Sequence, residues 1–204
     1  MPEKVPGPSA PAAFTDALDA IRAAQTRPEL AVAEITAPQG LAPYSIALSA
    51  NVTPARHDSD SDLGTGRFVL LFDPSAPEAW GGQFRVVCFA QAPLEPEIGL
   101  DPFLSDVAWS WLTDALDAHG ARYLAPSGTT TRILSTGYGE LASEGDGSQI
   151  ELRASWTPIA VDAASRAGLG AHVESWGDLL CMFAGLPPAV EGVSLLSARR
   201  VGRE

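Results

Sequence analysis

The residues with the most obvious capacity for chemistry lie in the stretch His57-Asp58-Ser59-Asp60-Ser61-Asp62, where carboxylates alternate with serines. Alternate carboxylates also begin a calcium-binding loop. That motif requires a glycine where Leu63 stands and a closing glutamate where Val69 stands. We therefore interpret the stretch as a solvated loop between two strands and predict no calcium site.

Histidines and cysteines, which bind transition metals and act in catalysis, are few and scattered. His57, His119 and His172 fall on three different predicted elements, and the two cysteines lack a C-x-x-C spacing. No zinc site is therefore predicted. Cys88 and Cys181 lie in apolar stretches, where a thiol has a raised pKa and low reactivity.

His172 is the best candidate for an acid–base group. It lies at the edge of an apolar helical stripe, near Glu174 and Cys181, although a histidine in such a place often has only a structural role. The chain has no G-x-S-x-G elbow, and its paired glycines lack the lysine of a phosphate-binding loop. We assign no catalytic residue, metal or cofactor. Whether the protein is an enzyme stays open, with a non-catalytic protein favoured.

Arginines on predicted strands form the second candidate site. Arg132, Glu151 and Arg153 are expected on the outward face of the sheet, together with Ser45, Ser49, Asn51 and Ser155. Arginines can grip a carboxylate through two parallel hydrogen bonds. This face could therefore bind a carboxylate ligand or the acidic side chains of a partner; the alternative is a solvated face on which Glu151 pairs with an arginine.

Three tryptophans complete the candidate binding residues. Trp80 lies in a loop between predicted strands and could be an exposed anchor or could pack over the sheet edge. Trp109 and Trp111 are expected at opposite rims of the buried face of a helix, so each is either a core residue or a contact residue.

The elements that must position these residues follow from hydrophobic spacing. Helices are predicted at about 12–25, 105–119 and 162–184, with a break near Gly168, and strands at 30–37, 44–52, 66–73, 83–92, 130–138 and 149–157. Ser105 and Asp106 are expected to cap the second helix, and Gly120 and Gly185 to end the second and third helices. The fold class is therefore α+β, with a mainly antiparallel sheet of about six strands and three helices.

The faces of the predicted strands differ. Strand 44–52 alternates apolar and polar residues, as a strand with one solvated face does. Strands 66–73 and 83–92 are apolar on both sides, so their outward face needs cover from a helix, a loop or a second subunit. We treat residues 1–11 as a flexible lead-in, 12–188 as a single domain and 189–204 as a C-terminal tail.

Composition limits the partners and the compartment. Thirteen basic and 25 acidic residues give a formal net charge of −12, which disfavours nucleic acid as a partner. The chain has no apolar signal segment and no apolar run near the ~20 residues that span a membrane. Two isolated cysteines are typical of a reducing compartment. We expect a cytoplasmic protein that does not contact a membrane.

Several stretches across nearly the whole chain resemble an uncharacterised actinobacterial family, the domain-of-unknown-function family numbered three thousand. These are 27–29, 41–44, 66–74, 109–120, 153–158, 179–181 and 184–188, and they include Trp109-Ser-Trp111 and Arg153-Ala-Ser-Trp156. The resemblance implies an actinobacterial cytosolic protein and no assigned activity. The order of elements is also similar to that of secretion-chaperone-like folds, which often dimerise.

The sequence thus favours a cytoplasmic protein-binding or adaptor module without catalytic activity. It leaves open whether the partner is another protein or a second copy of the chain. The alternative is a small-molecule enzyme or ligand-binding protein that uses the strand arginines in a pocket between sheet and helix.

Overall fold

The computed structural model describes residues 10–53, 63–159 and 167–186. The described elements, in chain order, are α1 (Ala12–Arg22), β1 (Leu30–Ile35), β2 (Tyr44–Val52), β3 (Thr65–Phe72), β4 (Phe84–Leu94), the one-turn helix α2 (Pro96–Gly99), α3 (Leu104–Ala118), β5 (Tyr123–Ser135), the 3₁₀ helix η1 (Gly139–Glu144), β6 (Gly147–Pro158) and α4 (Ala167–Phe183). The predicted α+β class is confirmed; the two short helices were not predicted.

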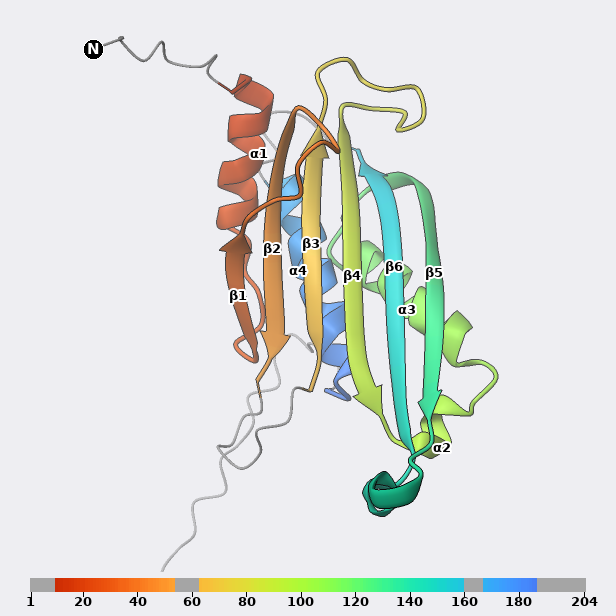
Figure 1. Ribbon diagram of the computed structural model, residues 1–204. Helices are drawn as coiled ribbons and strands as arrows, with labels where there is room; N and C mark the ends of the chain where they lie inside the picture. The colour runs from red at the N-terminus through yellow and green to blue at the C-terminus, as the bar shows by residue number, and fades with distance from the viewer. Residues whose placement is uncertain (1–9, 54–62, 160–166, 187–204) are drawn as a thin grey trace, which may run out of the picture.

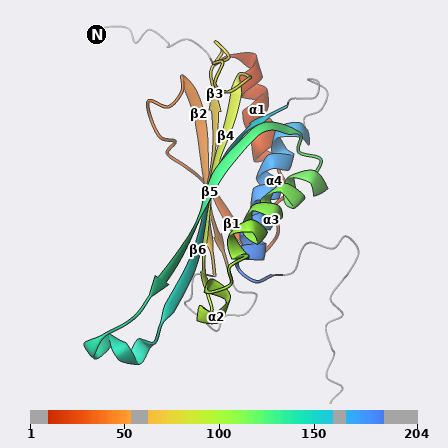
Figure 2. The same ribbon diagram turned by 90° about the vertical axis from the view of Figure 1, so that its right-hand side faces the viewer.

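All six strands form one antiparallel sheet in the order β1-β2-β3-β4-β6-β5. Helices α1, α3 and α4 lie behind this sheet in Figure 1 and on one side of it in Figure 2. Within the described ranges, the opposite face of the sheet carries no helix. We call it the open face.

The core lies between the sheet and the three long helices. Alternate residues of the central strands point into it, including Ile46 and Leu48 on β2, Phe68 and Leu70 on β3, and Trp156 on β6, all buried. Helix α4 is buried on almost every side, because it lies against the sheet and also contacts α1 and α3. Its two carboxylates, Glu174 and Asp178, are half-buried.

The helix ends were predicted unevenly. Gly120 has φ +64°, and the amide of Ala121 donates to the carbonyl of Leu116 at 2.8 Å, as expected for a glycine that ends α3. The predicted cap at Ser105 and Asp106 is wrong: α3 begins at Leu104, and no side chain caps it.

The edge strand β5 begins at Tyr123, seven residues before the predicted start. Pro126 and Gly128 resemble turn residues, but the structure accommodates them in a strand with an irregular register between Leu124 and Ser127, next to Ala125 at φ +48°. The strand is exposed on both faces, so it lacks the alternation that marks a strand in sequence.

Several expectations fall on residues outside the described ranges. These are most of the N-terminal lead-in, the C-terminal tail, the acidic stretch 57–62 and the first five residues of the predicted third helix. Across the described ranges, none of the helices combines the length and the apolar character needed to cross a membrane.

Gly66 is a packing requirement of the core. A Cβ atom there would lie 2.7 Å from a methyl carbon of Leu180 on α4 and 2.8 Å from the carbonyl oxygen of Phe89 on β4. We expect Gly66→Ala to lower the free energy of unfolding by about 2 kcal/mol, because neither the buried leucine nor the backbone has room to move. Urea denaturation measures the effect.

Gly168→Ala is the matched control, since a Cβ atom there meets nothing within 4 Å and alanine favours a helix. This variant should be roughly 0.5 kcal/mol more stable than the wild type. Equal stability of Gly66→Ala and wild-type protein would show that α4 does not pack on β3 as described.

Candidate functional site

A row of side chains crosses the open face of the sheet. In the strand register Ser49 lies opposite Arg67, Arg67 opposite Phe89, Phe89 opposite Arg153, and Arg153 opposite Thr129. Directly opposed residues of antiparallel strands point to the same face, so the phenyl ring lies between two arginines. We call Arg67, Phe89 and Arg153 the arginine row.

The two arginines of the row are held differently. The guanidinium of Arg153 lies over the Phe89 ring, 5.5 Å from its centroid, and its Nε donates to Oε1 of Glu151 at 2.7 Å. The Arg153 side chain is nevertheless 67% exposed, so its two terminal nitrogens face solvent. Arg67 is exposed and has no hydrogen-bond or ion-pair partner among the described residues. Arg153 is therefore ion-paired with Glu151, as the solvated-face alternative expected, although its terminal nitrogens can still donate. Arg67 has no carboxylate partner among the described residues.

A shallow groove of about 570 Å³ runs along this row. Its lining is Thr65, Arg67, Val69, Val87, Cys88, Phe89, Gln91 and Arg153. Val87 is 38% exposed, which is unusual for a valine in the middle of a sheet. The sequence predicted that the outward face of the central strands needs cover. Within the described residues that face is covered only in part, since Ala47 and Leu71 on it are buried while Val87 is exposed.

A third arginine on the open face has a structural role. The guanidinium of Arg85 donates to four neutral oxygens: the carbonyl of Ala125 and the hydroxyls of Ser127, Ser155 and Thr157. These bonds join β4, β5 and β6. Partial burial lowers the pKa of Arg85, and its charge has no ionised partner among the described residues. The strands contribute three arginines and one carboxylate, Glu151, to this face.

Arg132 does not belong to this surface. It lies opposite Ile150, a core residue, and therefore points to the helix side of the sheet. There its Nη1 donates to the carbonyl oxygen of Asp101 at 2.7 Å. The expectation that Arg132 and Arg153 share one face is wrong, because β5 offers no hydrophobic alternation from which the direction of its side chains could be read.

The predicted tryptophans contact the rest of the structure. The carbonyl of Trp80 accepts a hydrogen bond from the hydroxyl of Thr157, and its side chain is half-buried. Trp109 packs over Gly128 of β5, and Trp111 packs on Phe183 of α4 with ring centroids 6.1 Å apart. The two α3 tryptophans therefore bracket its buried face, as expected, and join it to β5 on one side and α4 on the other.

His172 is a core residue with only 1% of its surface exposed. Its Nδ1 accepts a hydrogen bond from the indole nitrogen of Trp156 at 3.0 Å, which requires a ring without a proton on that nitrogen. Burial lowers the pKa of His172 to about 4. The structure thus favours the structural interpretation of this histidine over the acid–base one.

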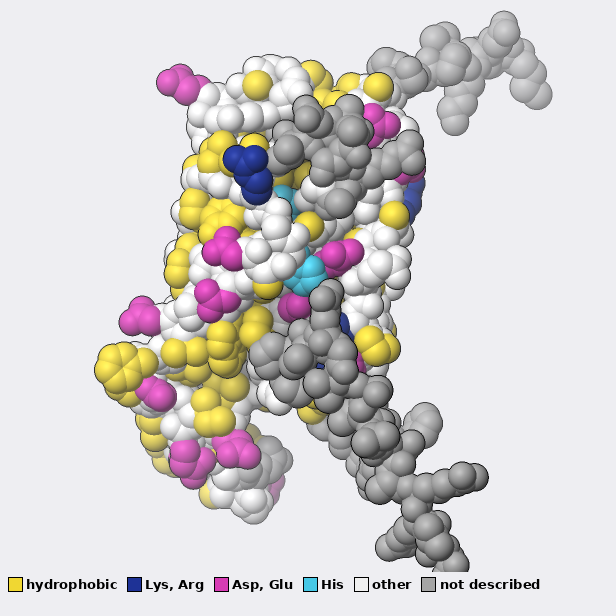
Figure 3. All heavy atoms as spheres, turned by 180° about the vertical axis from the view of Figure 1, so that it is seen from behind, with side chains coloured by type: hydrophobic (Ala, Val, Ile, Leu, Met, Phe, Trp, Pro, Cys, Tyr) yellow, Lys and Arg dark blue, Asp and Glu magenta, His cyan; other side chains and the backbone are white. Residues whose placement is uncertain are grey.

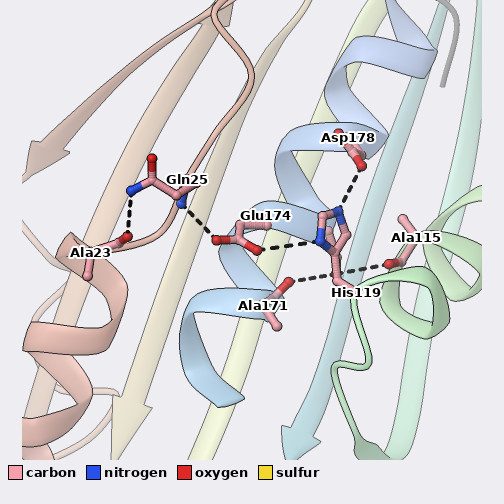
Figure 4. Close-up of polar contacts among 8 residues, drawn as sticks. Ala23, Gln25, Ala115, His119, Ala171, Glu174 and Asp178 are labelled. Atoms are coloured by element: carbon pink, nitrogen blue, oxygen red, sulfur yellow. Dashed lines mark hydrogen bonds and ion pairs between the residues drawn. The ribbon is translucent and has the colours of Figure 1, made fainter. Parts of the chain in front are cut away.

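Sequence reasoning missed a polar cluster at the junction of the helices, shown in Figure 4. Nε2 of His119 lies 2.8 Å from Oδ2 of Asp178, its Nδ1 lies 3.4 Å from Oε2 of Glu174, and Glu174 also accepts from the backbone amide of Gln25. The hydroxyl of Ser175 adds a bond to the carbonyl of Ala115. The cluster joins the chain after α1 to α3 and α4. Only the spacing of Glu174 and Asp178, one helical turn apart, hints at it in the sequence.

The cluster and the cysteines offer no catalytic constellation. The carboxylates of Glu174 and Asp178 contact opposite nitrogens of the His119 ring, so the three side chains do not converge on one point. Within the described ranges, no group of three or more histidine, cysteine, aspartate or glutamate side chains is arranged to hold a metal ion. Burial raises the pKa of Cys88 to about 12 and that of Cys181 to about 11, which keeps both thiols protonated and poorly nucleophilic.

These observations define a class of protein: an α+β fold with one open antiparallel sheet, helices on a single face and an arginine row on the other. The chain belongs to the family described as Protein of unknown function (DUF3000), whose model matches residues 10–194. The family resemblance read from the sequence is thereby confirmed. A search of curated proteins and a search of solved structures each returned no match.

His172 gives a prediction about acid stability. Above about pH 6.5 the imidazole is neutral in both the folded and the unfolded protein and contributes no pH dependence. As the pH falls from 6.5 toward 4, the unfolded chain takes up a proton that the folded one resists, so folding loses stability, on the order of 3 kcal/mol at full effect.

His172→Asn is the matched variant, because its amide oxygen can still accept from Trp156 while the titration is removed. Urea denaturation at several pH values should show a shallower loss between pH 6.5 and 4 for this variant than for wild type. Parallel pH profiles would mean that His172 is not the neutral, buried group described here.

Proposed function

We propose that this protein is a non-catalytic binding module whose open sheet face binds an acidic segment of another protein. The observation that carries the proposal is the arginine row, in which Arg67 and Arg153 flank the half-buried ring of Phe89 and the Arg153 guanidinium lies over it. A ligand that suits this row places an apolar or aromatic side chain beside Phe89 and the exposed Val87, and a carboxylate at each guanidinium.

The distribution of charge supports an acidic ligand. The whole chain has a formal charge of −12, yet the strands give the open face two more arginines than carboxylates. A positive face on an acidic protein orients an acidic ligand toward that face, since the rest of the surface repels it. The same overall charge weighs against nucleic acid, which is negative along its whole length.

The alternative is a small-molecule enzyme or ligand-binding protein. A pocket that uses both Arg132 and Arg153 is ruled out by their positions on opposite faces of the sheet. A free dicarboxylate could still bind the arginine row, because its chemistry is that of an acidic peptide. The groove is shallow and open, however, which suits a chain segment lying across the strands better than an enclosed metabolite.

We also propose that this module acts in the cytoplasm of an actinobacterium. The source is what the sequence resemblance implies, and the two unpaired, buried cysteines support a reducing compartment.

The proposal is tested with an array of short peptides in which one phenylalanine is flanked by glutamates. Wild-type protein should bind such peptides, and the affinity should fall as salt is added, because the ligand contacts exposed charges. Arg67→Ser and Arg153→Ser should each weaken binding about tenfold, the value of one charge-assisted contact of ~1.4 kcal/mol. Fluorescence anisotropy measures the affinities.

Arg132→Ser is the matched control, since it removes the same charge from the helix side of the same hairpin. It should leave the affinity unchanged. An equal loss of affinity in all three variants would mean that only the net charge of the protein matters, which would contradict a site on the open face. Binding of free dicarboxylates with no binding of peptides would replace the proposal by the ligand-binding alternative.

A further inference from the structure

Strand β5 is a long unprotected edge of the sheet. It pairs with β6 on one side, and no described strand pairs with its other side, which faces the viewer in Figure 2. Alternate backbone amides and carbonyls of such a strand point away from the sheet and act as a template for another strand. The opposite edge, β1, has six residues against thirteen in β5.

Only the first part of β5 carries features that block pairing. Pro126 and the irregular register between Leu124 and Ser127 interrupt it there. The following stretch Ser127–Ser135 has no proline, no carboxylate and one charge, Arg132, whose guanidinium is turned toward Asp101. In a protein with so many carboxylates, this stretch is the part of the sheet edge best able to approach an equally acidic partner.

An exposed apolar patch adjoins the far end of this stretch. Its large side chains come from α2, the segment that leads into α3, the first turn of α3 and the end of β5, and Figure 3 shows hydrophobic side chains gathered in this region at the lower left. They are Ile98, Leu100, Phe103, Val107 and Leu134. Phe103 is 68% exposed and Leu134 is 55% exposed, so the patch is unusually apolar for a solvated surface.

We propose that β5 pairs antiparallel with β5 of a second copy of this chain, about a two-fold axis at Thr131. This axis is at the middle of Ser127–Ser135, so all nine residues pair. Arg132 of one copy then lies opposite Thr130 of the other, and no charge opposes a like charge. The proposal is independent of the ligand of the open face.

The same register brings the apolar patch of each copy against the other copy. Leu134 of one copy lies opposite Gly128 of the other, on the helix side of the sheet, where Trp109 already packs over the glycine. Leu134, at the edge of the patch of one copy, thus lies beside Trp109 of the other copy, where Gly128 has no side chain to block the contact. A strand with a glycine near one end and an exposed leucine near the other is complementary to itself, which favours a second copy over an unrelated strand.

Sedimentation velocity of the full chain between 1 and 100 μM tests the proposal. Wild-type protein should form a dimer in this range. Thr131→Asp places two carboxylates directly opposite each other at the axis, each beside Glu151 of its own β6, and should raise the dimer dissociation constant at least tenfold. Thr15→Asp adds the same charge on α1, at the other edge of the sheet, and should not change the dissociation constant.

A cysteine variant tests the register. Thr131→Cys should form an intermolecular disulfide under mild oxidation, while Ser110→Cys, exposed on α3, should not; the native cysteines are buried and do not compete. A wild-type monomer at 100 μM overturns the proposal, as does a dimer unaffected by Thr131→Asp. Thermal melting that matches wild type shows that the aspartate variant is folded, and a loss of peptide binding by Arg67→Ser leaves the dimer result unchanged.

Discussion

The packing of α4 against the helix side of the sheet is the interaction on which the rest of the structure depends. Leu180 fills the space that Gly66 leaves open, and the indole nitrogen of Trp176 donates to the carbonyl of Phe89 at 3.2 Å. Gly66 precedes Arg67, and Phe89 carries the central ring of the arginine row. The core helix therefore fixes, through the backbone, the positions of side chains that point away from it.

One-sided packing has a consequence for the opposite face. Burying α4 among α1, α3 and the sheet places every long helix on the same side. The part of the second face of β3 and β4 that the described residues do not cover, around Val87, must therefore be stable while exposed. Hydrogen bonds between strands supply part of this stability, since the guanidinium of Arg85 donates to the hydroxyls of Ser127, Ser155 and Thr157. Val87 remains exposed, and a sheet face of this kind is stabilised further when a ligand covers it.

The sequence predicted those features whose signal is local. β2 was predicted at its observed bounds, because one buried face produces strict alternation, and Gly120 and Gly185 end their helices at positive φ. Features that depend on register were not found: a row across β3, β4 and β6 joins residues 67 and 153, and no spacing in the chain encodes that distance. The His119 cluster was missed for the same reason, and the face of Arg132 was misassigned because β5 has no buried side to impose a pattern.

The two proposed surfaces reinforce each other geometrically. Pairing of β5 about Thr131 continues the sheet through two copies and brings both arginine rows onto one face, related by the two-fold axis. Arg153 lies opposite Thr129, two residues from the axis, and β6 is one strand removed from it. With spacings of ~3.4 Å along a strand and ~4.8 Å between strands, the two Arg153 positions are about 20 Å apart. A partner with two acidic segments at that separation would bind the second row as an intramolecular step, so modest affinity at each row suffices for a stable complex.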